Sequence, residues 1–304
     1  MENKSSITAL MSAFGRAYHN ENSKNPIFKD TVARKLMTDD EYRMIGEYIL
    51  AGFDFFAPEK KSLFDNKKDA LQYLVNTQIA PTPLARAKFC EESLKIAVMT
   101  GTKQYVILGA GLDTFALREK ELMKSLKVFE VDHPLTSADK QERIKISGFS
   151  LPKNLTFVSC DFTKDNLCEK LIDAGYDKTK KTFFSWLGVS YYLDKETIDR
   201  FIKNIACICS EGSSLLFDYA DCNMFLSDVK RVQNMIAMAK AGGEEMKSSF
   251  DCLTIEMMLS KYRFLVYEHL DRNKIQKRYF SGRNDELSAF EHINYALAVL
   301  KQQK

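Results

Sequence analysis

The segment QYVILGAGLDT, residues 104–114, constrains the fold of this chain more than any other. Its apolar part, Tyr105–Leu108, predicts a short buried strand, and the turn that follows carries Gly109 and Gly111. Because glycine has no Cβ, such a turn lets the backbone come within contact distance of a ligand. A strand, a glycine-rich turn and a helix together are typical of folds that hold an adenosine-containing cofactor.

The next apolar strand, Val128–Val131, ends at Asp132, where such folds place an acid that accepts hydrogen bonds from a ribose. The dinucleotide fingerprint has a third glycine beneath the pyrophosphate, and this chain has Thr114 there. Asp113 would repel a pyrophosphate, but it attracts the ammonium group of a methionine tail. The pattern therefore favours S-adenosyl-L-methionine over NAD, with a plain tight turn between strand and helix as the alternative.

The composition argues against several classes of protein. The net charge of +3 and the lack of a basic stripe give no indication of nucleic-acid binding. No apolar run is long enough for a membrane span, and the N-terminus lacks the apolar stretch of a secretory signal. The seven cysteines are scattered, without a C-x-x-C pair, so we expect no metal site and a reducing, cytoplasmic location.

From residue 104 onward, apolar strands alternate with amphipathic helices. This alternation predicts an α/β, Rossmann-like fold with a mostly parallel seven-stranded sheet and helices on both faces. The last two strands are close in sequence, which favours a hairpin-like pair and an antiparallel edge strand. The expected strands are Tyr105–Leu108, Val128–Val131, Leu155–Ser159, Thr182–Trp186, Ser214–Asp218, Phe264–His269 and Asn294–Leu300.

The first hundred residues are predicted to be helical, and Pro81 and Pro83 are expected to break the run before the last of these helices. We therefore expect residues 1–100 to form a helical cap on a Rossmann-like domain of residues 101–304. The expected cap helices are Ile7–Tyr18, Asp30–Leu36, Asp39–Leu50, Asp69–Ile79 and Pro83–Met99.

Four motifs occur in an order that is more specific than any of them alone: LGAGLDT (108–114), FEVDHP (129–134), SCDF (159–162) and GVSYYL (188–193). Together they resemble the leucine carboxyl methyltransferase family, over nearly the whole chain. The family consists of class I enzymes that use S-adenosyl-L-methionine. Some members methylate the C-terminal leucine of a phosphatase, and many bacterial members are small-molecule O-methyltransferases. The resemblance implies a class I methyltransferase that acts on a carboxylate or phenolic oxygen.

The resemblance also implies roles for individual residues. The matching cofactor-binding positions are Arg86 for the cofactor's carboxylate, Gly109 and Gly111 for the turn with Asp113 beside it, Asp132 for the ribose, and Asp161 with Phe162 for the adenine. A guanidinium fork suits a carboxylate partner. The alternatives are that Arg86 is a surface residue and that the carboxylates of Asp132 and Asp161 only cap helices.

One position departs from the family pattern. Leu187 stands where the family usually has a glutamate near the methionine end of the cofactor. Without that charge, the cofactor's ammonium group must be held by backbone carbonyls or by another acid. The departure also argues against a phosphatase as substrate.

A phenolic acceptor would benefit from a general base, whereas a carboxylate needs none. The candidate catalytic residues are Tyr191, His19 and His133, and a structural role is the alternative for each. Methionines offer a soft apolar wall for a small-molecule acceptor, namely Met235, Met238, Met246, Met257 and Met258. Two other functions stay open: a non-catalytic scaffold, which Leu187 favours, and an NAD-dependent oxidoreductase. The oligomeric state is not predicted.

Overall fold

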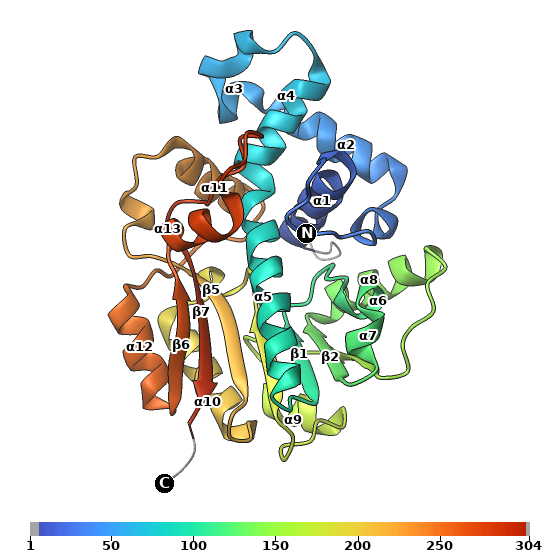
Figure 1. Cartoon of the computed structure of the whole chain (residues 1–304), viewed down its shortest axis with the longest axis vertical. Coiled ribbons are helices and arrows are strands. Elements are labelled where there is room, and N and C mark those ends of the chain that lie inside the picture. Colours follow the sequence, from blue (N-terminus) through green and yellow to red (C-terminus); the bar gives the residue numbers. More distant parts are fainter. Residues whose placement is uncertain (1–5, 302–304) are drawn as a thin grey trace.

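A seven-stranded sheet organises the chain in the computed structural model, which describes residues 6–301 (Figure 1). The strand order is β3-β2-β1-β4-β5-β7-β6, and only β7 runs antiparallel to its neighbours. The strands are β1 Gln104–Leu108, β2 Lys127–Asp132, β3 Leu155–Ser159, β4 Thr182–Trp186, β5 Ser214–Ala220, β6 Phe264–Leu270 and β7 Ile293–Leu300. All seven predicted strands and the α/β fold class are thus confirmed.

The hairpin-like pair β6–β7 is also confirmed, but the antiparallel strand lies one position inside the edge of the sheet. β7 is buried along nearly its whole length and needs a neighbour on each side. In β6 only the two end residues, Phe264 and Leu270, are buried, so this strand suits the edge.

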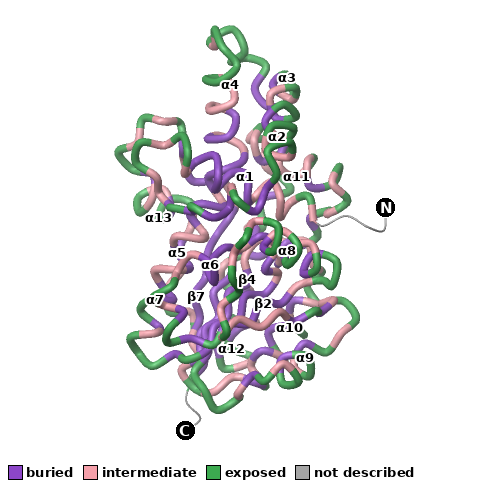
Figure 2. Tube along the Cα trace, turned by 90° about the vertical axis from the view of Figure 1, so that its right-hand side faces the viewer, coloured by how far each residue is buried: buried purple, intermediate pink, exposed green. Residues whose placement is uncertain are grey.

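Alternate residues of each strand face two different apolar layers. In β1, Tyr105 and Ile107 pack into a cluster shared with the N-terminal helices, whereas Val106 and Leu108 pack into a cluster with α10 (Lys195–Ile208). Figure 2 shows this buried core running through the sheet and up into the base of the cap.

The other helices on or near the sheet are short. They are α6 Phe115–Arg118, α7 Lys120–Met123, α8 Pro134–Ile146, α9 Leu167–Asp173, α11 Lys230–Ala241, α12 Cys252–Lys261 and α13 Arg272–Ile275. The 3₁₀ turns η4 Ser190–Tyr192 and η5 Met224–Leu226 and the π-helical turn η6 Gln276–Phe280 complete this part of the chain.

The N-terminal helices gather above one end of the sheet (Figure 1). They are α1 Ile7–Asn22, α2 Asp39–Ala51, α3 Phe53–Phe56 and α4 Lys67–Leu74, with the 3₁₀ turns η1 Ala33–Leu36 and η2 Pro58–Leu63. The helix expected over residues 30–36 is reduced to η1. The buried Asp30 carboxylate accepts the backbone N–H groups of Val32 and Ala33 at the start of this turn.

A helix does begin at the prolines, because α5 (Pro81–Met99) starts at Pro81, but the chain keeps its direction there. α4 continues through a π-helical turn, η3 (Val75–Ile79), into α5, and Ala80 donates its N–H to the Val75 carbonyl at 2.8 Å. Pro81 occupies the first position of α5, where a missing N–H costs no helical bond. The result is one long column that leads from the cap down along the sheet (Figure 1).

Of the helices within residues 6–301, none combines the length and the hydropathy that a bilayer crossing requires. Over the same residues, no group of three or more His, Cys, Asp or Glu side chains is arranged to hold a metal ion.

Candidate active site

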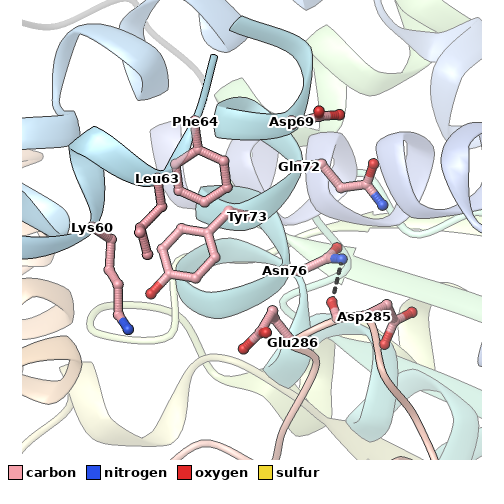
Figure 3. A pocket seen from close by; sticks show the side chains of 9 residues that line it. All are labelled: Lys60, Leu63, Phe64, Asp69, Gln72, Tyr73, Asn76, Asp285 and Glu286. Carbon is pink, nitrogen blue, oxygen red and sulfur yellow. Dashed lines mark hydrogen bonds between the residues drawn. The ribbon is translucent and has the colours of Figure 1, made fainter. Parts of the chain in front are cut away.

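Two hollows in the described part of the protein differ in size and lining. The smaller, of about 390 Å³, lies where α4 and η3 meet the loop at residues 285–286 (Figure 3). There the Asn76 amide donates to the Asp285 carbonyl at 2.7 Å. None of the residues that the sequence singles out lines this hollow.

The larger cavity, of about 650 Å³, opens at the carboxyl ends of the parallel strands and is covered by α1. Parallel α/β sheets bind their ligands at this end. The cavity brings together every predicted cofactor-binding residue, together with two of the three base candidates: Arg86, Gly109, Gly111, Asp113, Asp132, Asp161, Phe162, Leu187, His133 and Tyr191.

The glycine turn needs both of its glycines. Gly109 has φ 69° and Gly111 has φ 47°, in the left-handed region that side chains disfavour. A Cβ on Gly109 would lie 2.5 Å from Val189 Cγ2, and one on Gly111 would lie 3.0 Å from the Ala9 Cβ of α1. The turn therefore packs tightly beneath the first helix of the cap.

Asp132 lies at the end of β2 and faces the turn. Its Oδ2 accepts the Gly111 N–H at 2.5 Å, and its Oδ1 accepts the His133 N–H at 2.7 Å. Burial raises the pKa of Asp132 above its ordinary value, while these two N–H groups favour the charged form. A carboxylate has about four acceptor sites, so it can also accept hydrogen bonds from two ribose hydroxyls.

Asp161 follows β3 and shapes the next part of the wall. Its Oδ1 accepts the Thr163 N–H at 3.0 Å and the Thr163 hydroxyl at 2.6 Å. The Thr163 hydrogen bonds hold the pKa of Asp161 below its ordinary value. The neighbouring Phe162 ring packs edge-on against Phe201 with the ring centroids 5.2 Å apart, which fixes it in the wall.

Arg86 lies at the centre of a buried polar cluster that the sequence reasoning missed. Its Nη1 donates to Asp218 Oδ2 at 3.1 Å and to the Tyr191 hydroxyl at 3.0 Å. Burial opposes the charge, but Tyr191 and Asp218 raise the pKa of Arg86 above its ordinary value. The Asp218 side chain is fully buried, so this carboxylate positions Arg86 and does not reach the cavity.

Asp218 also holds the backbone at the end of β4, where its Oδ1 accepts the Gly188 N–H at 2.6 Å. An acid inside the apolar strand SLLFDYA was a visible signal of this role. The sequence alone does not show which face of β5 carries the Asp218 side chain. The pairing of β4 with β5 decides this and gives Asp218 its partners.

Gly188 lets Arg86 lie directly on the backbone. It has φ 74°, and a Cβ there would lie 2.6 Å from Arg86 Nη1. We expect Gly188→Ala to displace the guanidinium and weaken binding of S-adenosyl-L-homocysteine by about tenfold or more, as for a lost charged hydrogen bond. Calorimetric titration measures the effect.

The matched control is Gly148→Ala, since Gly148 has φ 71° but no atom within 4 Å of a Cβ. It imposes the same left-handed strain, about 1–2 kcal/mol, without a clash. Equal affinities in the two variants would contradict the role given to Gly188.

The base candidates do not share one location. His19 does not line the cavity: it is buried, its Nε2 accepts the Ile27 N–H at 3.0 Å, and burial lowers its pKa to about 4. It is therefore a neutral structural acceptor at pH 7. Burial raises the pKa of Tyr191 well above its ordinary value, which makes it a poor base. His133 lines the cavity beside Asp132, and its Nδ1 accepts the Leu135 N–H at 3.3 Å at the start of α8.

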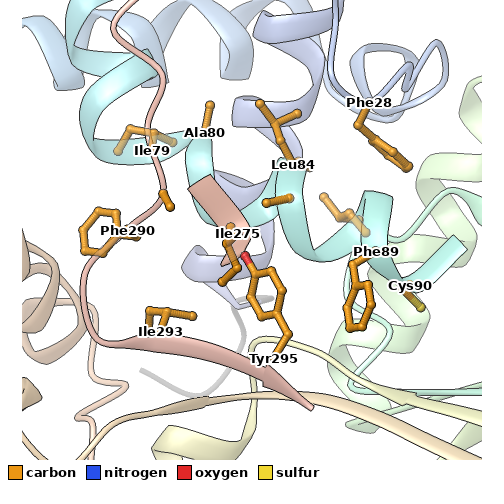
Figure 4. Close-up of a cluster of buried hydrophobic side chains, with 14 of the residues drawn as sticks. Phe28, Ile79, Ala80, Leu84, Phe89, Cys90, Ile275, Phe290, Ile293 and Tyr295 are labelled. Carbon is orange, nitrogen blue, oxygen red and sulfur yellow. The ribbon is translucent and has the colours of Figure 1, made fainter. Parts of the chain in front are cut away.

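The half of the cavity beneath the cap is largely apolar. Met235 and Met238 of α11 line it as expected, but Met246, Met257 and Met258 do not. Ile79 and Phe290 also line it, and both belong to the apolar cluster drawn in Figure 4. The cavity thus has a charged half at the strand ends and an apolar half under α1 and α11.

The model of the family described as leucine carboxyl methyltransferase matches residues 9–206 of the chain. This range includes strands β1 to β4 and every predicted cofactor-binding and catalytic residue. The chain belongs to the leucine carboxyl methyltransferase family.

Curated relatives of this methyltransferase match most or nearly all of its length. It is 44% identical over 303 residues to a Bacillus subtilis (strain 168) protein named "Putative S-adenosyl-L-methionine-dependent methyltransferase YktD", with 99% of each chain covered. It is 28% identical to a protein of Mycolicibacterium paratuberculosis with the same general name, over 87% of this chain and 80% of that one.

Solved structures support the fold of the methyltransferase. A crystal structure of a "putative methyltransferase" from Thermobifida fusca aligns with a TM-score of 0.57 at 12% identity, covering 98% of this chain and 96% of that one. A protein of the DUF574 family from Streptomyces avermitilis aligns with a TM-score of 0.55 at 15% identity, covering 84% and 95%. At such identities the likeness concerns the fold alone.

Proposed function

We propose that this chain transfers a methyl group from S-adenosyl-L-methionine to a carboxylate or phenolic oxygen of a small molecule. Methyl transfer from this cofactor is the activity of the family to which the chain belongs. The observation that carries the proposal is the meeting of the glycine turn, Asp132, Asp161 and Arg86 around one cavity.

The residues present fit the cofactor. Asp132 would accept the ribose hydroxyls, and Asp161 beside Phe162 would accept the amine of the adenine. Arg86 uses Nη1 for Asp218 and Tyr191, and its Nη2 donates to the Ser12 hydroxyl at 3.4 Å, so other N–H groups of the guanidinium can serve the methionine carboxylate. Asp113, whose Oδ1 accepts the Phe115 N–H at 2.7 Å, supplies a carboxylate for the ammonium group that Leu187 cannot hold.

When bound, the cofactor would supply a methyl group on a sulfonium, and transfer to the acceptor oxygen would leave the sulfur as the leaving group of S-adenosyl-L-homocysteine. The protein's part is to align the acceptor and to exclude water. The helix α1 covers the cavity and so excludes water. On one side of α1, Arg16 donates a hydrogen bond to the Leu112 carbonyl at 2.7 Å. On the other side Glu244 accepts the hydroxyls of Ser6 and Thr8.

Two further inferences accompany the proposed methyl transfer. We infer a reducing, cytoplasmic environment, because the cysteines at all seven positions are free thiols. We also infer that the helices before α5 act as a cap for the acceptor.

The first experiment is a calorimetric titration of the protein with S-adenosyl-L-methionine, S-adenosyl-L-homocysteine and NADH. We expect micromolar binding of both sulfur ligands and no binding of NADH. Formation of S-adenosyl-L-homocysteine is then followed with panels of carboxylic acids and phenols.

Each outcome separates the proposal from its rivals. NADH binding alone would support an oxidoreductase. Binding of the sulfur ligands without turnover of any acid or phenol would support the scaffold that Leu187 favours. Absence of all binding would refute the methyltransferase assignment of the cavity.

A further inference from the structure

Ser12 of α1 lies between two arginines in the wall of the larger cavity. Its Oγ accepts a hydrogen bond from Arg16 Nη1 at 3.1 Å and a longer one from Arg86 Nη2 at 3.4 Å. Arg16 lies one turn further along the same helix, whereas Arg86 comes from α5. All three residues line the cavity, so Ser12 stands where the helix that covers the site meets the arginine assigned to the cofactor.

The Ser12 hydroxyl has only its proton left to offer. A serine oxygen has two acceptor lone pairs and one O–H donor, and the two guanidinium contacts use both lone pairs. Serines on helices can donate their proton to the carbonyl of the preceding turn, and Ser147, directly after α8, does so to the Arg143 carbonyl at 2.7 Å. Within residues 6–301, the Ser12 proton has no acceptor.

A second free donor lies beside this proton. Arg86 Nη2 carries two N–H groups, and within the described residues its one hydrogen bond goes to Ser12. The pairing of Arg86 with Asp218 and Tyr191 through Nη1 leaves this end of the guanidinium open to the cavity. An ammonium group cannot accept a hydrogen bond, but a carboxylate accepts two donors with its two oxygens. The pair of donors therefore suits a carboxylate.

We propose that Ser12 is a ligand of the cofactor's carboxylate, to which it donates its hydroxyl proton beside Arg86. The inference rests on the proposed methyl transfer and adds to the donor site a contact from α1. Hydrogen bonds to an ionised acceptor are stronger than those between neutral groups. A filled donor site thus helps to hold α1 over the cavity, and Ser12 distinguishes ligands that carry the carboxylate from those that lack it.

The test compares S-adenosyl-L-homocysteine with its decarboxylated analogue, which keeps the ammonium group and lacks only the carboxylate. Ser12→Ala should weaken binding of S-adenosyl-L-homocysteine by about tenfold or more, as for a lost hydrogen bond to a charged group. The affinity for the analogue should change by less than about twofold, because this ligand offers Ser12 no charged acceptor. Calorimetric titration measures both dissociation constants, with displacement of S-adenosyl-L-homocysteine used for the weaker ligand.

Thr8→Val is the matched control. Thr8 lies one turn before Ser12 on α1, but its hydroxyl donates to Glu244 and contacts no arginine. Loosening of α1 in this variant should affect both ligands to the same extent. Equal losses for the two ligands in Ser12→Ala, no loss for either, or the same selective loss in Thr8→Val would each overturn the inference and leave the proposed function intact. Failure of the wild type to bind S-adenosyl-L-homocysteine would overturn the proposed function as well.

Discussion

Replacing Asp218 by alanine is expected to lower the free energy of unfolding by about 3–5 kcal/mol, because it leaves the buried Arg86 guanidinium without its charged partner. The substitution also removes the acceptor of the Gly188 N–H. Urea unfolding followed by circular dichroism measures the change.

The control for this effect is Asp199→Ala. Asp199 pairs with Lys261 at 2.8 Å on the surface, where an ion pair contributes about 0–1 kcal/mol. The double variant Arg86→Met with Asp218→Ala should recover part of the lost stability, since it removes the stranded charge. A similar loss in Asp199→Ala and Asp218→Ala, or no recovery in the double variant, would show that the buried pair does not act as described.

The second large effect is expected at the donor site. Asp132→Ala should reduce the affinity for S-adenosyl-L-homocysteine by about a hundredfold or more, because it removes two hydrogen bonds from ribose hydroxyls to a charged group, each contributing about 1.5–3 kcal/mol. Asp132→Asn, which keeps the shape and one acceptor, should lose less. Calorimetric titration at fixed salt concentration gives the ratio of the dissociation constants of each variant and the wild type.

An exposed acid away from the cavity provides the comparison. Asp173 ends α9 and is exposed, so Asp173→Ala should leave the affinity unchanged. If Asp132→Ala bound the ligand as tightly as Asp173→Ala, Asp132 would be no more than a support for the Gly111 turn.

The sheet was predictable because its strands carry their own signals. Segments such as Leu155–Ser159 and Thr182–Trp186 are rich in apolar and aromatic residues and have the bounds observed in the structure. Candidate site residues such as Gly109, Gly111 and Asp132 stand directly at strand ends, so the parallel sheet alone brings them to one edge.

What could not be predicted depends on contacts between distant segments. The partnership of Arg86 with Asp218 requires α5 to lie over the junction of β4 and β5, which no local pattern specifies. His19 lies in α1 of the predicted cap, yet its ring accepts the Ile27 backbone N–H and does not line the cavity. Pro81 reads locally as a break, although a π-helical turn carries the helix into it.

The two halves of the cavity have different origins along the chain. The carboxylates and glycines assigned to the cofactor lie in residues 109–161, at the ends of strands. The walls under the cap come from α1, from the η3–α5 junction and from α11 with the loop at Phe290. Under the proposed function, the acceptor walls can therefore change without a change in the strand-end segments that would hold the ribose and adenine of the cofactor. Overall sequence identity is then a poor guide to shared substrates, and homologues that act on the same acceptor are better recognised by residues 7–16, 78–83 and 235–244 than by the glycine turn.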